Sequence, residues 1–227
     1  MAFIALPVKV PAIIKLFYRN YIWDKFRETG SEKVIYLTFD DGPIPEVTPW
    51  VLDLLNEFNA KATFFCIGEN VVRHPGIFKK VLESGNTIAN HTYNHLKGWG
   101  TEAEEYVANV LEAEEILKKS AQIPLKSTVE QVFLKPKMLR PPYGKITKKQ
   151  AKQLKSQDYE IIMYDVIAYD WDHNIPAEKC IENITHHAKP GSIVVFHDSL
   201  KAERNLKIAL PEVLKYYKKK GYKFKAL

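Results

Sequence analysis

The feature that most constrains the fold is the alternation of short β-branched apolar runs with longer amphipathic stretches. Runs of this kind stand at 33–39, 62–68, 87–92, 159–166 and 191–199, and a further short strand is expected in 138–144. Between most of these runs, apolar residues recur three or four positions apart, which is the spacing of one face of a helix. Strands that alternate with helices form parallel βαβ units with right-handed crossovers. The sequence therefore predicts an α/β fold on a parallel sheet.

Helix start and stop signals mark three of the amphipathic stretches. In 47–59, Thr48 is a candidate N-cap followed by a proline, and in 74–85 the closing signal is Gly85. Thr101 and Glu104 have the spacing of a capping box at the start of 101–120. A lysine-rich helix at 147–155, a short helix in the next loop and a final helix complete the expected set. Residues 120–138 are less regular and receive no assignment.

The sheet is expected to curl into a barrel. No glycine-rich phosphate loop follows the first strand, which argues against an open nucleotide-binding sheet and favours a barrel-like closure. The 227 residues contain no Gly/Ser linker and no internal repeat, so we expect one domain at 31–227.

The segment 1–30 is expected to pack on that domain. Its first part is apolar but is interrupted by prolines and lysines, with neither a cleavable signal nor the roughly 20 apolar residues of a spanning helix. Contact with a membrane surface is a second expectation for this segment. Localisation stays open, with the cytoplasm or a membrane surface favoured over secretion.

The charge balance and the cysteines argue against two classes of protein, those that bind nucleic acid and those built on a disulfide framework. The formal net charge is +6, mostly from lysine-rich helical faces, and no nucleic-acid-binding motif accompanies it, so nucleic acid is not an expected partner. Cys66 and Cys180 stand in apolar patterns without C-x-x-C spacing, which predicts reduced core residues.

Polar residues cluster where five of the predicted strands end. In a parallel barrel these ends open on one rim, where side chains from distant segments converge. The sequence therefore predicts one pocket there. The clusters are Asp40-Asp41, His91 with His95, Arg140 to Tyr143, Asp165 with Asp170-Trp171, and His197-Asp198.

Two of these clusters predict a divalent metal site. A His-x-x-x-His spacing puts His91 and His95 on one side of a helical turn. An aspartate added to them gives a two-histidine, one-carboxylate set with open positions for water and substrate. A cation would also relieve the repulsion between Asp40 and Asp41. One of the two would hold the ion, while the other would remain free to accept a proton from water.

The remaining clusters suit acid chemistry and sugar binding. His197 emerges from a run apolar enough to be buried, opposite the candidate base, which suits a general acid. A carboxylate such as Asp170 could hydrogen-bond its ring and favour the imidazolium. Tyr143, Trp171 and Trp99 offer flat apolar faces for a sugar ring.

With these residues in hand, the chain resembles the polysaccharide deacetylases that share the NodB homology domain, carbohydrate esterase family four. The resemblance covers residues 34–227 and includes five motif regions in order: TFDDGP, HTYNH, RPPYG, DVIAYDW and VFH. It implies a distorted (β/α)7 barrel and hydrolysis of N-acetyl groups on the amino sugars of a peptidoglycan- or chitin-like glycan. It also implies a divalent metal, by default Zn²⁺.

The resemblance implies a role for each motif residue. Asp40 is similar to the catalytic base, and Arg140 to the arginine that orients it. Asp170 resembles the partner of the catalytic histidine, and His197 the general acid. The metal ligands would be Asp41, His91 and His95. Substrate would be bound by the backbone N–H of Tyr143, and by Trp171 and Val195, which would line the acetyl pocket.

Other functions stay open at this stage. A non-haem iron oxygenase could use the same ligand set, and an inactive carbohydrate-binding module could keep the pocket without the chemistry. A glycosidase fits poorly, because adjacent Asp40 and Asp41 cannot straddle a glycosidic bond.

Overall fold

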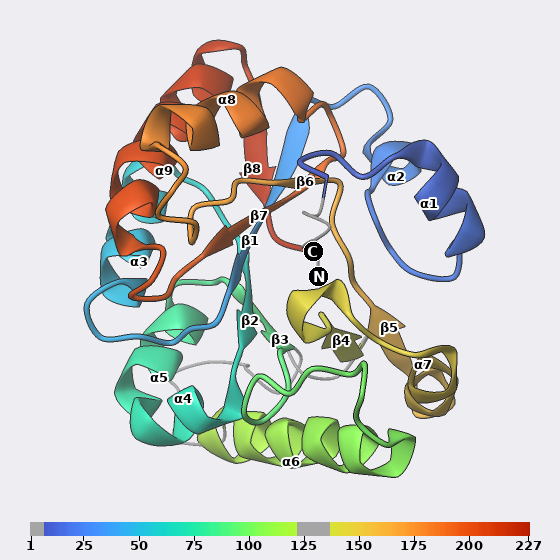
Figure 1. Cartoon of the computed structure of the whole chain (residues 1–227). Helices are drawn as coiled ribbons and strands as arrows, with labels where there is room; N and C mark the ends of the chain where they lie inside the picture. The colour runs from blue at the N-terminus through green and yellow to red at the C-terminus, as the bar shows by residue number, and fades with distance from the viewer. Residues whose placement is uncertain (1–6, 122–136) are drawn as a thin grey trace.

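A parallel sheet forms the centre of the protein, shown in Figure 1 by a computed structural model that describes residues 7–121 and 137–227. Seven strands follow the order β5-β4-β3-β2-β1-β7-β6, and β8 pairs with the first part of β1. Every pairing between these strands is parallel. The strands are β1 Val34–Asp40, β2 Thr63–Cys66, β3 Thr87–Asn90, β4 Lys137–Leu139, β5 Tyr159–Ile161, β6 Val166–Ile167, β7 Ile193–His197 and β8 Lys223–Lys225.

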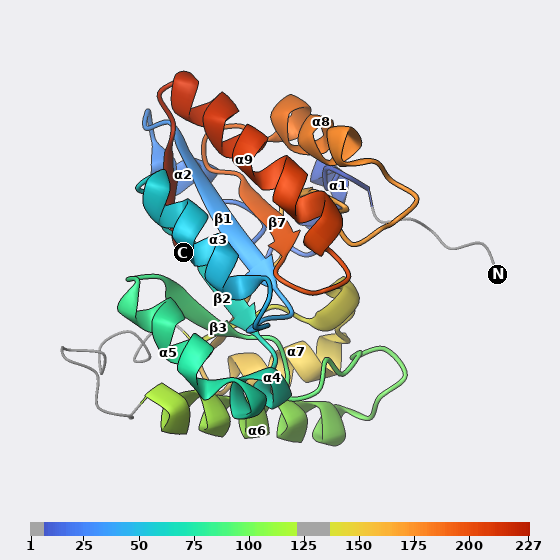
Figure 2. The ribbon, with the colours of Figure 1, turned by 90° about the vertical axis from the view of Figure 1, so that its left-hand side faces the viewer.

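Helices surround the outside of the curled sheet, with α3 and α9 lying over β1 and β7 in Figure 2. The predicted α/β fold, a distorted barrel of parallel strands with outer helices, is thereby confirmed, and the curled sheet takes the form of a half-barrel. The helices are α1 Ala12–Phe17, α2 Phe26–Thr29, α3 Thr48–Glu57, α4 Gly68–Arg73, α5 Pro75–Glu83, α6 Ala103–Ala121, α7 Lys148–Lys155, α8 Ala177–His187 and α9 Glu203–Lys219, with a 3-10 turn η2 at Pro142–Gly144.

Alternation along the central strand decides which side chains reach the interior. Phe39 points outward into the core beneath the helices and stacks on Phe64 and Phe196, with ring centroids 5.1 and 6.2 Å away. Burying each such ring contributes roughly 1.5–3 kcal/mol. Since successive side chains on a strand face opposite sides, Thr38 and Asp40 face the barrel interior. The outward core thus fixes the inward direction of Asp40.

The sheet is not closed by hydrogen bonds between β5 and β6, and the N-terminal segment bridges that gap. Ile22 forms a parallel bridge with Ile162, and its carbonyl accepts the N–H of Met163 at 2.7 Å. Lys9 forms an antiparallel bridge with Val166. Residues 9–24 therefore complete one wall of the half-barrel, although the division of the chain at residue 30 stays a prediction.

The outer face of α1 carries exposed apolar side chains. Ile13, Leu16 and Phe17 have 56%, 65% and 77% of their surface exposed. Across the described residues, none of the helices combines the length and apolar character needed to cross a bilayer. Contact of this segment with a membrane surface stays a prediction.

The predicted strand at 159–166 is wrong as a single element. Its residues form two strands, β5 and β6, which stand at opposite ends of the strand order. The apolar run contains no turn signal, so its sequence looks continuous. Between the two strands, the chain crosses the gap that residues 9–24 fill, and no helix separates them as one does in the other βαβ units.

Two predicted helix caps are also wrong. Thr48 is the first residue of α3 rather than its cap, and its hydroxyl donates to the buried carboxylate of Asp198 at 2.6 Å. The hydroxyl of Thr101 donates to the carbonyl of Lys97, and α6 begins at Ala103. In both places the hydroxyl that the local pattern predicts as a helix cap forms a hydrogen bond elsewhere, to a distant side chain or within a loop. Cys66 and Cys180 are free and buried, as predicted.

Candidate active site

A cavity of about 700 Å³ opens at the carboxyl ends of the strands. Its lining comes from segments between residues 40 and 201, as the strand-end pattern predicted. Of the predicted site residues, all but Asp170 contribute to the wall, and Asp170 lies directly behind one that does. The site residues in the wall are Asp40, Asp41, His91, His95, Arg140, Tyr143, Trp171, Val195 and His197.

Asp40 ends β1 and is held by Arg140. The Arg140 Nη1 donates to Asp40 Oδ1 and to Thr38 Oγ1, both at 2.7 Å, and Nη2 donates to the Met163 carbonyl at 3.0 Å. Its guanidinium lies 4.0 Å from the ring centroid of Phe65. Burial tends to raise the pKa of Asp40, but the positive charges of Arg140, His91 and His197, together with the hydrogen bond from Arg140, outweigh it and hold that pKa below its usual value. Asp40 is therefore an oriented carboxylate, and Thr38 is a positioning residue that the sequence did not single out.

Asp41 follows in a turn that other side chains fix. Its φ is +83°, a left-handed conformation uncommon for a non-glycine residue, and its carbonyl accepts Asn70 Nδ2 at 2.7 Å. The carboxylate of Asp198 accepts the N–H of Gly42 at 3.0 Å, next to the Thr48 hydroxyl already described. Asp198 itself does not line the cavity, and burial raises its pKa to about 8. This aspartate holds the turn instead of facing substrate.

His91 and His95 lie on a loop after β3, so the helical turn predicted for this pair is wrong. The loop reverses because Asn90 Oδ1 accepts the N–H of Thr92 at 2.7 Å, and because Thr92 and His95 have φ of +67° and +58°. A β-branched residue at such a φ is strained, and strain of this kind persists only where surrounding contacts over-determine it. The two imidazole centroids are 5.0 Å apart.

Asp41, His91 and His95 form a group with the geometry of a metal site. The Nε2 atoms of His91 and His95 lie 3.6 and 3.4 Å from Asp41 Oδ1, and the three ligand atoms are all within 4.8 Å of one another. His91 Nδ1 is 2.7 Å from the Arg140 carbonyl, which can only accept, so the Nε2 lone pair faces the group. Burial lowers the pKa of His95 to about 4, which favours its neutral form. Two neutral imidazoles and a carboxylate fit a divalent cation.

His197 ends β7 and is held by Asp170. Its Nδ1 lies 2.9 Å from Asp170 Oδ1, and its backbone N–H donates to Oδ2 at 2.7 Å. Burial opposes protonation of His197, but the charge and hydrogen bond of Asp170, with the charges of Asp41 and Asp40, outweigh it and raise the pKa to about 9. The ring of Trp171 meets His197 edge-on at 4.5 Å and stacks on Tyr169 at 4.8 Å. The imidazolium therefore faces the cavity between an aromatic wall and a buried carboxylate.

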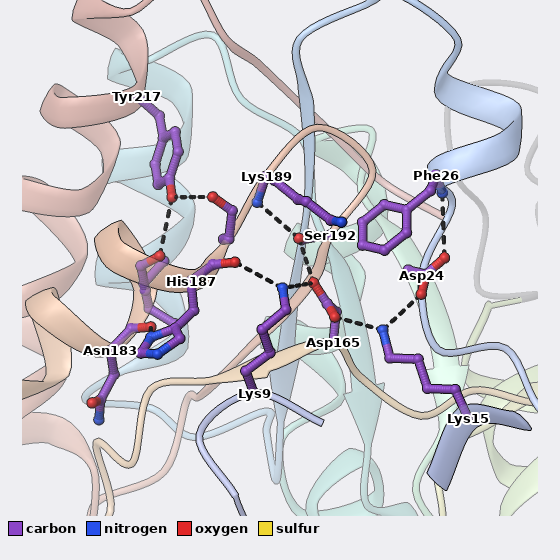
Figure 3. A network of polar contacts seen from close by, with 12 residues as sticks. Lys9, Lys15, Asp24, Phe26, Asp165, Asn183, His187, Lys189, Ser192 and Tyr217 are labelled. Atoms are coloured by element: carbon purple, nitrogen blue, oxygen red, sulfur yellow. Dashed lines mark hydrogen bonds and ion pairs between the residues drawn. The ribbon is translucent and has the colours of Figure 1, made fainter. Parts of the chain in front are cut away.

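Asp165 does not belong to this rim, contrary to the prediction. It precedes β6 and is fully buried, with Lys9 Nζ at 3.1 Å, Lys15 Nζ at 2.5 Å and Ser192 Oγ at 2.6 Å (Figure 3). Because Asp165 and Ser192 stand before their strands, this network lies at the opposite end of the sheet. The aspartate fastens the N-terminal segment to the half-barrel.

A parallel half-barrel with an Asp-His-His group flanked by a carboxylate and a histidine has the arrangement of a metal-dependent hydrolase. The chain belongs to the polysaccharide deacetylase family, whose sequence profile matches residues 27–162.

Named relatives agree with that membership. The chain is 36% identical over 197 residues to a peptidoglycan-N-acetylglucosamine deacetylase of Bacillus cereus, covering 86% of each chain. It is 33% identical to a chitooligosaccharide deacetylase of Azorhizobium caulinodans, covering 76% of this chain and 77% of that one. Among solved structures, the Bc1960 peptidoglycan N-acetylglucosamine deacetylase matches with a TM-score of 0.82 and 31% identity, over 96% of this chain and 95% of that one.

Proposed function

We propose that this protein removes acetyl groups from the N-acetylated amino sugars of a glycan. Water adds its oxygen to the acetyl carbon, the carbon–nitrogen bond breaks, and acetate and a free amine leave. The observation that carries the proposal is that Asp40 and His197 flank one Asp-His-His group in a single cavity. The relatives named for peptidoglycan and for chitooligosaccharide support an acetylated amino-sugar glycan as substrate.

A divalent cation, with zinc as our first choice, would be held by Asp41, His91 and His95. Zinc accepts nitrogen and oxygen donors at four positions, so three protein ligands leave one open. The orientation of His91 by the Arg140 carbonyl supports this ligand set. When bound, such an ion polarises the acetamide carbonyl and lowers the pKa of water.

Asp40 would act as the general base. The hydrogen bond from Arg140 Nη1 to Oδ1 fixes the carboxylate on one side and leaves its second oxygen to accept the proton of the attacking water. Its lowered pKa keeps it ionised before the reaction begins.

His197 would act as the general acid. The hydrogen bond to Asp170 occupies Nδ1, so the proton delivered to the departing nitrogen would come from Nε2. Trp171 and Val195 would pack on the acetyl methyl group, because both line the cavity beside His197. The Tyr143 N–H would donate to the developing oxyanion, as the left-handed turn at this residue lies on the cavity wall.

The test is an acetate-release assay on a panel of soluble acetylated glycans, with and without a chelator. The proposal expects release that the chelator abolishes and that added Zn²⁺ restores. A catalytically inactive binding module would bind glycan with the chelator present and release no acetate. An iron oxygenase would instead show ultraviolet–visible changes on anaerobic addition of iron and a co-substrate.

A further inference from the structure

Trp99 is an exposed indole that is nevertheless firmly anchored. More than half of its surface, 55%, is exposed, while its Nε1–H donates to the Ile146 carbonyl at 3.2 Å. Gln150, which has no exposed surface, donates from Nε2 to the carbonyls of Gly98 at 2.8 Å and Thr101 at 3.0 Å. These contacts clamp both sides of the tryptophan. An exposed aromatic held in one place is suited to binding, since little rotamer entropy is lost on contact.

The clamp joins Trp99 to the wall of the catalytic cavity. The N–H of Gly98 donates to the Lys145 carbonyl at 3.0 Å, and a Cβ added to Gly98 would lie only 2.5 Å from that oxygen. Lys145 lines the cavity two residues after Tyr143. The Nζ atom of Lys145 lies 5.5 Å from the centroid of the Trp99 ring. The loop of Trp99 and the cavity wall are therefore one packed unit.

Lys145 is a cation without an anionic partner. Within residues 7–121 and 137–227, no carboxylate lies within 4 Å of its Nζ. By contrast, the buried Arg140 in the same wall is paired with Asp40. A second lysine of the wall, Lys201, is exposed and likewise has no carboxylate partner in the described chain. Nearby Asp172 already accepts two hydrogen bonds from Asn174.

An exposed indole with an ammonium group over its ring, and no carboxylate paired with that ammonium, fits one kind of ligand. The carbon–hydrogen face of a pyranose packs on an indole, and an ammonium group attracts a carboxylate. A neutral glycan would use only the first of these contacts. A purely packing role for Trp99 accounts for the anchoring hydrogen bond but not for an indole left largely in water.

We propose, resting on the function proposed above, that Trp99 and Lys145 form a subsite for a neighbouring sugar that carries a carboxylate. The subsite lies beside the catalytic cavity, on the side of Tyr143. Trp99 binds the sugar ring, and Lys145 pairs with the carboxylate. Lys145 is thus a specificity residue that favours acidic glycans over neutral ones.

The test compares two soluble tetrasaccharides with equal numbers of N-acetyl groups, one neutral and one with a lactyl carboxylate on alternate sugars. Lys145→Gln should lower the ratio of kcat/KM for the acidic over the neutral glycan about fivefold, as expected for a partly solvated ion pair. Lys145→Glu should lower it further. Lys152→Gln is the matched control, because Lys152 is exposed on α7 and does not line the cavity. In this variant the ratio of kcat/KM for the acidic over the neutral glycan should stay at the wild-type value.

Isothermal titration of the same glycans separates this inference from the proposed function. If wild type binds the acidic glycan more tightly and Lys145→Gln removes that preference, the subsite stands even where no acetate is released, and only the proposed function fails. If acetate is released but Lys145→Gln leaves the preference for the acidic glycan unchanged, in kcat/KM and in binding, the subsite is refuted and the proposed deacetylase function remains. Absence of binding by wild type refutes it as well. Trp99→Ala should weaken the binding of both glycans severalfold. An unchanged melting temperature of this variant would show that it still folds.

Discussion

Asp40 and His197 are register partners on the neighbouring parallel strands β1 and β7. One residue pair earlier along the same two strands, Phe39 faces Phe196 in the outer core. Alternation then turns both Asp40 and His197 toward the barrel interior, where they flank Asp41. The backbones of Asp40 and His197 are thus one interstrand spacing apart, about 4.8 Å.

The two residues are held in opposite charge states by separate partners. Arg140 stabilises the Asp40 carboxylate, while Asp170 stabilises the His197 imidazolium. Without these partners, a buried aspartate and a buried histidine would both tend toward their neutral forms. One carboxylate ready to accept a proton and one imidazolium ready to give it is the condition for acid–base hydrolysis at a single centre.

Replacing Asp40 by Asn should reduce acetate release by about a thousandfold, in the range typical for a general base. The Asn carbonyl still accepts from Arg140, so the fold should persist, and the ligand group does not include this residue. Acetate release and zinc content of the purified variant check both parts. Asp53→Asn, on the exposed face of α3, is the control. A variant with more than a tenth of wild-type activity would refute Asp40 as the base.

His91→Ala should lose both metal and activity. His91 is almost fully buried and supplies one of three ligand nitrogens or oxygens, so its loss leaves two. Zinc content after dialysis should fall from one ion per chain to a small fraction. His186→Ala, an exposed histidine on α8, should retain the ion. Full zinc occupancy in His91→Ala would exclude that residue as a ligand.

Activity should decline as the pH rises through about 9. His197 must be protonated to act as an acid, and its pKa is raised to about 9, so the protonated form is present below that pH and is lost above it. Asp170→Asn removes the charge that raises this pKa, and should move the alkaline limb of the pH–rate profile down by about one to three units. If the alkaline limb of the pH–rate profile stays in place in Asp170→Asn, that limb does not report the protonation of His197.

Most of the candidate site was predictable from the sequence because its residues lie at, or a few positions after, the carboxyl ends of apolar strands. The inward direction of Asp40 and His197 follows from the alternation of side chains along a strand, and the apolar runs at 33–39 and 191–199 already predict those two strands. The loop of His91 and His95 was not predictable in detail. Its left-handed residue Thr92 depends on Asn90 Oδ1, a contact that leaves no periodic trace in the sequence.

Asp165 shows where the same reasoning fails. Its run looks like one strand with an aspartate at its end, but the strand stops at Ile161 and a new one begins after the aspartate. Its role is revealed by its tertiary partners, among them Lys9 and Lys15, which lie about 150 residues away in the chain. Local pattern cannot distinguish an aspartate before a short strand from one after a long strand.

Gly42→Ala should disrupt the turn that holds Asp41. A Cβ at residue 42 would lie 2.0 Å from Asp198 Oδ2 and 2.5 Å from Asp198 Cγ, so the Asp198 carboxylate would have to leave the Gly42 N–H. Zinc affinity should fall at least tenfold, measured by competition with a chromophoric chelator. Gly76→Ala is the matched control, because an added Cβ there meets nothing within 4 Å. Equal zinc affinities for the two variants would contradict a positioning role for Asp198.

Asp165→Ala should destabilise the whole protein while sparing the chemistry of molecules that remain folded. Removing the fully buried carboxylate takes the shared partner from the partly exposed ammonium groups of Lys9 and Lys15, although Lys15 keeps Asp24, and losing a hydrogen bond to a charged group typically costs about 1.5–3 kcal/mol. Urea unfolding should show that loss in the free energy of unfolding, whereas Asp53→Ala on the exposed face of α3 should change it by less than about 0.5 kcal/mol. Because Asp165 lies at the end of the sheet opposite the cavity, kcat per folded molecule should stay near the wild-type value. A free energy of unfolding within 1 kcal/mol of wild type would mean that the N-terminal segment does not depend on this network to stay in the gap between β5 and β6.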